Sequence, residues 1–491
     1  MKKILTFAIA FALAFAILQP AVAFAKEDNL LRIYSWEDYI STDEDTGKTL
    51  ADEFADWYKA KTGKTIRVEY STFGTNEIMY NELKITPGSY DLICPSEYMI
   101  QKMINENMLE EYSASFLDKS NPENYYINNV SGYIKNLFES HTTANGKSWA
   151  NYAAGYMWGT MGFIYNPNAI SSADIEHWKV VWDEQYKNES TLKDSVRDTY
   201  FMGLAYVYSD ELTALATRFK NGELTTEQYN TQVNAILNRT DDETIAKVEQ
   251  ALKQAKSNVF GFEVDSGKND MITGKININF AWSGDAVYAM DEAEEQGVQL
   301  NYSVPQEGSN IFFDGWVMPK GANTSLAEAF VNYISMPENA CANMDYIGYT
   351  SVIAGDEVFD RMVDYFELTT ADQYAELTAD EKEELTAVDL SYFFNDLSDG
   401  RSAVVYTDVT DRQFYAQYPD LDTINRCAIM NYFDSDTNEK ISILWENVKG
   451  TDLPIWVLVL LGALIAGYLG KIIAKKIYKI NRAKYILETK K

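Results

Sequence analysis

Apolar positions in the first part of the chain alternate between two spacings. Short runs rich in β-branched and aromatic residues predict strands, and these runs cover residues 31–34, 65–71 and 92–94. Segments with apolar residues every three or four positions predict helices, and these segments cover residues 49–62, 76–85 and 97–108. Strands that alternate with helices indicate an α/β fold with a mostly parallel sheet. In such sheets, ligands bind beyond the carboxyl ends of the strands.

A second part of the chain begins near Gly155 and contains two long polar stretches. Residues 209–255 are helical in character, and residues 366–388 are strongly acidic around residues 380–384. We interpret both stretches as exposed helical insertions and assign no chemistry to them. A surface for a protein partner is the alternative.

The N-terminus has the pattern of a secretory signal peptide. Lys2 and Lys3 precede an apolar run over residues 4–18, and Ala23-Phe24-Ala25 forms an Ala-x-Ala cleavage site. Residues 1–25 are therefore predicted to be a signal peptide, with an uncleaved anchor helix as the alternative. We expect the chain to be exported.

The C-terminus has the pattern of a membrane anchor. Residues 453–470 form an uncharged run of a length that can span a bilayer, with Trp456 and Tyr468 near its ends. Residues 471–491 are strongly basic, which predicts a cytoplasmic tail. A buried core helix is the alternative, but a basic tail does not usually follow one. The sequence thus predicts one C-terminal transmembrane helix, with the body on the outer side of the cytoplasmic membrane.

Charge and motif content exclude several functions. The net charge is −31, and the basic residues at both ends make the body more acidic still, so a nucleic-acid partner is not expected. His141 and His177 are the only histidines, and the three cysteines match no zinc or redox spacing. The motifs His-Glu-x-x-His, Gly-x-Ser-x-Gly and Gly-x-x-x-x-Gly-Lys are absent from the sequence. We expect that the protein is not an enzyme and has no cofactor or metal site. Catalysis by a pair of carboxylates is the alternative that the sequence leaves open.

Aromatic and acidic residues gather in four segments beside predicted strands. The segments are Tyr34–Tyr39, Pro95–Tyr98, Trp282–Asp285 and Phe312–Trp316. Aromatic faces bury the methylenes of an alkyl cation and attract its ammonium groups, while carboxylates accept its N–H donors. A sugar site would also be aromatic-rich but needs fewer acids, and an anion site needs basic residues, which these segments lack. The segments favour a small organic cation as ligand.

Several further motifs occur in a fixed order along the body. They are Tyr70-Ser71-Thr72 with Asn76-Glu77 and Met79-Tyr80, the run Tyr90–Ser96, Trp158-Gly159-Thr160 and Ile347-Gly348-Tyr349. Over about residues 31–450 the chain resembles the periplasmic spermidine- and putrescine-binding proteins of bacterial polyamine importers. The resemblance implies a polyamine receptor that serves the permease of an ABC transporter.

The resemblance also implies a fold and a set of ligand-binding residues. The fold is the two-lobed periplasmic-binding-protein fold of type II, with one lobe at 29–152 plus 312–357 and the other at 153–311 plus 358–450. The polyamine would lie between the lobes. The implied binding residues are Trp36, Tyr39, Ser96, Tyr98, Asp198, Trp282, Asp285, Phe312, Asp314 and Tyr349.

Departures from the family pattern bear on the ligand. Ser195 stands where the spermidine-type proteins carry an acid, Met430 stands where the family has Gln, and Asp198 is one methylene shorter than the family's Glu. Phe312 matches the putrescine-type proteins. A third ammonium would lack a counter-charge in a dry site, so putrescine is favoured over spermidine. A receptor for another small solute, an extracellular enzyme and a sensor are the alternatives.

Overall fold

The computed structural model describes residues 28–142, 146–408 and 412–450, together with Tyr468, Lys471 and Lys475. The chain divides into two compact units, residues 1–441 and 442–491. The predicted signal peptide and the predicted span at 453–470 lie outside the described residues, apart from Tyr468. Among the described residues, no helix combines the length and the apolar character that a membrane crossing requires.

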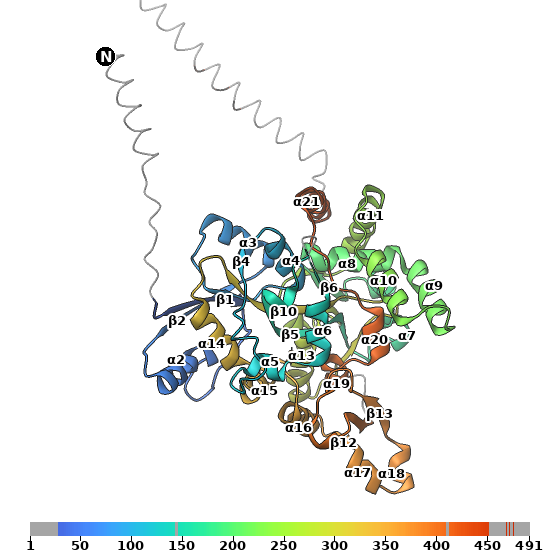
Figure 1. Cartoon of the computed structure of the whole chain (residues 1–491). Helices are drawn as coiled ribbons and strands as arrows, with labels where there is room; N and C mark the ends of the chain where they lie inside the picture. The colour runs from blue at the N-terminus through green and yellow to red at the C-terminus, as the bar shows by residue number, and fades with distance from the viewer. Residues whose placement is uncertain are drawn as a thin grey trace, which may run out of the picture. The chain divides into compact units, whose positions relative to one another are not determined.

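Strands and helices alternate through the larger unit (Figure 1). The strands are β1 (Leu30–Trp36), β2 (Arg67–Phe73), β3 (Leu92–Ile93), β4 (Leu109–Glu110), β5 (Ala153–Tyr165), β6 (Ser190–Lys193), β7 (Gly261–Glu263), β8 (Ile278–Trp282), β9 (Asn301–Ser303), β10 (Ile311–Pro319), β11 (Thr350–Ser351), β12 (Thr369–Thr370), β13 (Thr386–Asp389) and β14 (Val404–Thr407). The helices are α2 (Leu50–Thr62), α3 (Asn76–Ile85), α4 (Glu97–Asn105), α5 (Tyr125–Asn129), α6 (Gly132–Ser140), α7 (Ser172–Ile175), α8 (Val196–Val207), α9 (Ser209–Lys220), α10 (Thr226–Leu237), α11 (Asp242–Asn258), α12 (Gly267–Ile272), α13 (Ser283–Glu295), α14 (Thr324–Ile334), α15 (Pro337–Ile347), α16 (Asp356–Tyr365), α17 (Ala371–Glu376), α18 (Ala379–Glu383), α19 (Gln413–Gln417), α20 (Leu421–Arg426) and α21 (Ser435–Lys449), the last of which crosses the boundary between the units.

Local sequence signals fix several of these boundaries. Helix α2 begins after Thr49, whose side chain forms a capping box with Asp52, and ends at Gly63, which has a left-handed φ of 74°. Helix α3 matches its predicted range. Helix α4 is shorter than predicted and ends at Asn105, because Asn107 adopts a left-handed φ of 56°.

The main sheet corrects the expectation of mostly parallel strands. Its principal order is β2-β1-β3-β10-β5-β8-β6-β7. The pairs at both ends are parallel, but β10 pairs antiparallel with β3 and β5, and β5 pairs antiparallel with β8. Every residue of β5 and β10 is buried, so these two strands run through the centre of the core. The sheet confirms the α/β class, while the predicted lobe boundaries stay a prediction.

The two insertions differ from each other. Residues 209–255 form α9, α10 and most of α11, as predicted, but their apolar faces are buried, since Leu212, Val233 and Val248 are almost inaccessible. A Cβ added to Gly203 of α8 would lie 2.7 Å from Val248, so this glycine lets α11 approach closely.

The prediction of a wholly helical insertion at 366–388 was wrong. Only α17 and α18 are helical there, and β12 and β13 pair with β14 in a second, three-stranded sheet. Tyr374 of α17 stacks on Tyr406 of β14 at 3.6 Å between ring centroids, which anchors the helix to this sheet. β12, β13, α17 and α18 lie close together at the lower right of Figure 1.

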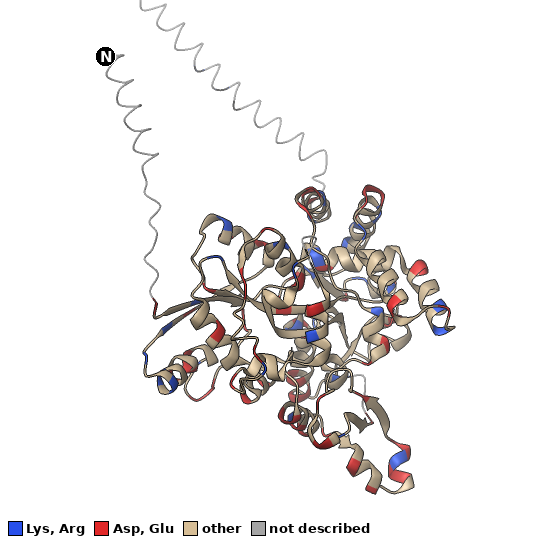
Figure 2. Ribbon diagram, in the orientation of Figure 1, with Lys and Arg blue, Asp and Glu red and all other residues tan. Residues whose placement is uncertain are grey.

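Acidic residues outnumber basic ones, 73 to 42, and are spread over most elements of the fold (Figure 2). The cysteines Cys94, Cys341 and Cys427 are buried and form no disulfide. The described body is therefore an acidic α/β unit without covalent cross-links.

Candidate functional site

Three carboxylates lie in the first turns of helices that directly follow strands. Glu97 begins α4 after β3, Asp198 lies in the first turn of α8 after β6, and Asp285 lies in the first turn of α13 after β8. The positive end of a helix dipole favours a carboxylate at this position. The strand–helix order therefore presents acids from three separate parts of the chain.

Asp314, on the core strand β10, interacts electrostatically with two of these carboxylates, Glu97 and Asp198. Its Oδ2 accepts a hydrogen bond from the Tyr39 hydroxyl at 2.6 Å, and its backbone pairs with Ser96 in an isolated bridge. The side chain is only 5% exposed, yet its Oδ1 has no hydrogen-bond partner among the described residues. Burial raises the pKa of Asp314 to about 6, although the hydrogen bond from Tyr39 and the nearby Ser96 act in the opposite direction.

Burial also raises the pKa values of Glu97 and Asp198. Burial, helped by the charge of Asp314, raises the pKa of Glu97 to about 8, and its Oε2 accepts a 3.3 Å hydrogen bond from the Phe313 N–H. Burial raises the pKa of Asp198 to about 6 despite a hydrogen bond from Ser195. The charge of Asp198 in turn acts on Glu97 and on Asp314. Such a cluster is stabilised by any cation that enters it.

Asp285, by contrast, is already paired inside the chain. The Lys193 ammonium lies 3.5 Å from its Oδ2 and 3.2 Å from Oε1 of Glu263, and the Lys268 ammonium lies 3.8 Å from its Oδ1. The Tyr349 hydroxyl donates to Oδ1 at 3.1 Å. The predicted ligand carboxylate is thus held by two lysines and a tyrosine.

Tyr349 joins the aromatic side chains of the site. Its ring packs edge-on against Tyr39, with 5.1 Å between centroids, and against Phe312, with 6.2 Å. A Cβ added to Gly284 would lie 1.9 Å from the Tyr349 ring. Only glycine at this position lets Tyr349 reach Asp285.

The other aromatic side chains have partners from the chain itself. The Lys193 ammonium lies 4.4 Å from the ring centre of Trp282, and the Arg197 guanidinium lies 4.3 Å from that of Tyr98. The Trp36 ring packs on Phe73, and its buried Nε1–H has no acceptor among the described residues. Internal cations therefore cover two of the predicted aromatic walls.

Direct contacts connect six of the ten predicted residues: Tyr39, Ser96, Asp285, Phe312, Asp314 and Tyr349. Electrostatic coupling adds Asp198 and Tyr98, and Trp282 joins through Lys193. Trp36 ends β1 and is tied by ring contact to Phe73 of β2. The roles of all ten in binding stay predictions.

Sequence reasoning missed five charged residues of the site: Glu97, Lys193, Arg197, Glu263 and Lys268. Glu97 lies within the segment Pro95–Tyr98, so the same acidic and aromatic signal could have identified it. Lys193 and Arg197 gave no local signal, because their partners Glu263, Asp285, Asn431 and Phe433 are distant in the sequence.

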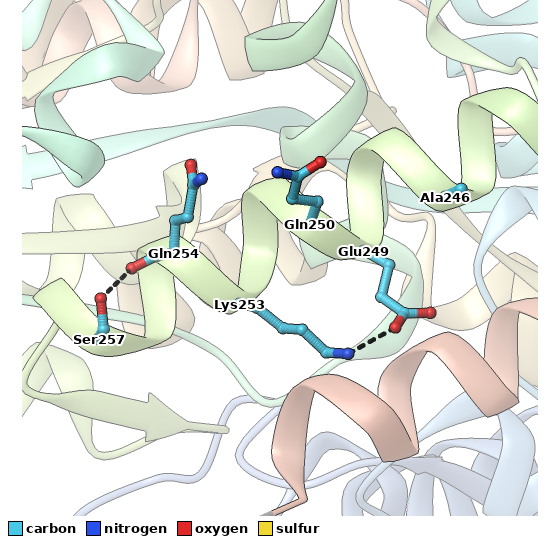
Figure 3. A pocket seen from close by; sticks show the side chains of 6 residues that line it. All are labelled: Ala246, Glu249, Gln250, Lys253, Gln254 and Ser257. Carbon is cyan, nitrogen blue, oxygen red and sulfur yellow. Dashed lines mark hydrogen bonds and ion pairs between the residues drawn. The ribbon is translucent and has the colours of Figure 1, made fainter.

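A shallow hollow elsewhere does not compete with this site. Figure 3 shows its lining, Ala246, Glu249, Gln250, Lys253, Gln254 and Ser257, all from α11. The Lys253 ammonium pairs with Glu249 at 2.6 Å, and the Ser257 hydroxyl donates to the Gln254 carbonyl at 2.7 Å. The face of a single helix whose polar groups are paired in this way offers no enclosure for a small solute.

Comparison with known proteins assigns the family. Residues 50–356 match the sequence pattern described as bacterial extracellular solute-binding protein. The chain belongs to this family. Among curated relatives of this solute-binding protein, the spermidine/putrescine-binding periplasmic protein of Salmonella typhimurium is 27% identical over 67% of the chain and 79% of the relative. The putrescine-binding periplasmic protein SpuD of Pseudomonas aeruginosa is 28% identical over 65% and 76%.

Solved structures agree with this assignment. The spermidine/putrescine ABC transporter substrate-binding protein PotD of Streptococcus pneumoniae aligns with a TM-score of 0.53 and 26% identity, over 86% of this chain and 98% of that one. A putative spermidine/putrescine ABC transporter protein of Listeria monocytogenes has the same fold, with a TM-score of 0.57 at 23% identity over 86% and 99%. The predicted family resemblance is confirmed, and so is the prediction that the chain is a solute-binding protein rather than an enzyme.

Proposed function

We propose that this solute-binding protein captures a small polyamine outside the cell, putrescine in preference to spermidine, and delivers it to the permease of an ABC transporter. The observation that carries the proposal is the buried Asp314 carboxylate with one unpartnered oxygen, beside Glu97 and Asp198. An ammonium group would donate to that oxygen, offset the charges of Asp314 and Asp198 and favour the ionisation of Glu97. The names of the relatives support the same ligand class.

The preference for putrescine rests on the charge balance of the site. Ser195 supplies no carboxylate, and Asp285 is held by Lys193 and Lys268. Few acids are then left for a third ammonium, whose burial without a partner would be costly. We further propose that the two lobes close on the ligand between them, since the site residues come from both sets of residues assigned to the lobes.

A thermal-shift screen of the purified full chain tests the ligand class. A ligand that binds only the folded state at 100 times its Kd adds about 2.7 kcal/mol to the free energy of unfolding. We expect putrescine, cadaverine and spermidine to raise the melting temperature, and sugars and neutral amino acids to leave it unchanged. Stabilisation by a sugar with no response to amines would contradict the proposal.

Binding should weaken in acid. The pKa values of Asp314 and Asp198, both about 6, lie above the ordinary value of 3.8 because the carboxylates are buried. Below pH 6 both groups take up protons, while an alkyl ammonium stays charged. We expect the Kd for putrescine to rise about fivefold per carboxylate between pH 6 and pH 5. Titrations at pH 5, 6, 7 and 8 measure this, and a constant Kd would contradict a role for these carboxylates.

We propose that residues 453–470 tether the protein to the membrane, with residues 471–491 inside the cell. The uncharged run followed by a basic tail supports this, and a tether keeps the receptor near its permease. Deletion of residues 451–491 should release the protein into the medium of a host without an outer membrane, as seen by immunoblotting of cells and supernatant. Retention of the shortened protein on the cells would rule out the tether.

A further inference from the structure

The ammonium of Lys193 lies where a ligand's ammonium would be expected to lie. It is 4.4 Å from the ring centre of Trp282 and 3.5 Å from Asp285, two of the residues predicted to hold a bound amine. Its charge also acts on Asp198. The chain's own lysine thus makes the two contacts that define an ammonium subsite, stacking on an aromatic face and pairing with a carboxylate.

The position of this lysine is fixed by its surroundings. Lys193 is the last residue of β6 and has no exposed surface. Besides Asp285, its ammonium pairs with Glu263 at 3.2 Å and donates to the Val264 carbonyl at 3.1 Å. Glu263 is itself held by the Gly267 N–H and the Asn279 amide. Because Glu263 and Asp285 are themselves buried, they hold the Lys193 ammonium in place as part of the site.

We propose that Lys193 determines ligand selectivity by fixing a positive charge beside Trp282, Asp285 and Asp198, which excludes amines that bring a further ammonium to this end of the site. This inference rests on the proposed function. In a buried environment like charges repel strongly, and Asp285 and Glu263 are already engaged. The carboxylates left for the ligand are those around Asp314, which suits a diamine and opposes a triamine.

Calorimetric titration of the full chain with putrescine and spermidine tests this role. The variants are Lys193→Met, which removes the charge at similar volume, and Lys193→Gln, which keeps a donor for the Val264 carbonyl. Lys275→Met is the matched control, because Lys275 also pairs with an acid, Asp270, and lies over an aromatic ring, Phe260, without contacting the predicted binding residues.

The deciding quantity is the ratio of the Kd for putrescine to the Kd for spermidine, since a general structural defect weakens the binding of both amines alike. We expect wild type to favour putrescine, both Lys193 variants to shift the ratio toward spermidine by about tenfold or more, and the control to keep the wild-type ratio. An unchanged ratio in a folded Lys193 variant overturns this inference and leaves the proposed function standing. Failure of wild type to bind any amine overturns both this inference and the proposed function.

A second measurement uses only the wild-type protein, in case the variants do not fold. Monoacetylation of spermidine at a terminal nitrogen removes one of its three charges. We expect acetylated spermidine to bind about tenfold more tightly than spermidine, because the repulsion from Lys193 is lost. Equal or weaker binding of the acetylated amine overturns the inference.

Discussion

Asp314→Asn is expected to abolish putrescine binding and, at the same time, to stabilise the empty protein. The variant removes the charge that an ammonium would neutralise, so we expect the Kd to rise at least about a hundredfold. Burial raises the pKa of Asp314 from 3.8 in the unfolded chain to about 6 in the folded one. Above pH 6 the folded protein therefore holds an ionised carboxylate that would be more favourable in water. Replacement by asparagine removes this buried charge and raises the free energy of unfolding by an amount on the order of 2–3 kcal/mol.

The sign and the pH dependence of this gain can be measured by thermal unfolding. Because the folded state binds the proton more tightly, the cost of the Asp314 charge is present above pH 6 and disappears as the pH falls toward 4. We expect the melting temperature of Asp314→Asn to exceed that of wild type at pH 7.5 and to match it near pH 4. Asp291→Asn is the control, since Asp291 also has a raised pKa but is satisfied by hydrogen bonds from Tyr365 and Gln413. A lower melting temperature for Asp314→Asn at pH 7.5 would contradict this account.

Asp285→Asn is expected to weaken binding as well, but to destabilise the protein. Asp285 faces the ammonium groups of Lys193 and Lys268. Removal of one partner from a buried ion pair leaves a buried charge uncompensated, which can cost about 3–5 kcal/mol. Glu263 still pairs with Lys193, so we expect a loss of about 1–3 kcal/mol and a lower melting temperature. The excess positive charge should also repel putrescine and raise its Kd.

The comparison of the two aspartates is informative because the substitutions are chemically identical. Opposite shifts in melting temperature at pH 7.5, with weaker binding in both variants, would establish that Asp314 lacks a counter-charge in the empty protein, whereas Asp285 is already paired with lysine. Equal shifts of the same sign would show that the two carboxylates have similar surroundings, contrary to the observed lysine pairs.

Much of the fold could be predicted because its signals are local. The Thr49 cap, the apolar face through Leu50 and Phe54, and Gly63 define α2 within a few turns of chain. The order of β5 and β10 in the sheet could not be read from spacing alone, because a strand buried on both faces shows no alternation. The acidic segment 366–388 was misread for a related reason. Its strands are only two to four residues long and depend on β14, which comes later in the chain.

The site was predictable in its acidic and aromatic members and not in its basic ones. Tyr39, Asp314 and Asp285 occur in segments whose composition already indicates a cation site. Tyr349 was implied by the family resemblance, and the structure brings it into contact with Tyr39 and Asp285. The pairing of Lys193 with Asp285 joins residues 92 positions apart. No local pattern reports such a contact, although it decides how many charges are left for the ligand.

The most direct test of the central claim is calorimetric titration of the full wild-type chain with putrescine at pH 7.5. The account predicts one site per chain and a micromolar or tighter Kd, with proton release on binding that comes mainly from Glu97, because its pKa of about 8 falls when a cation binds, whereas Asp314 and Asp198, with pKa values of about 6, are already ionised at pH 7.5. No binding heat at several temperatures, from a protein that unfolds cooperatively, would contradict the claim that this solute-binding protein captures a polyamine.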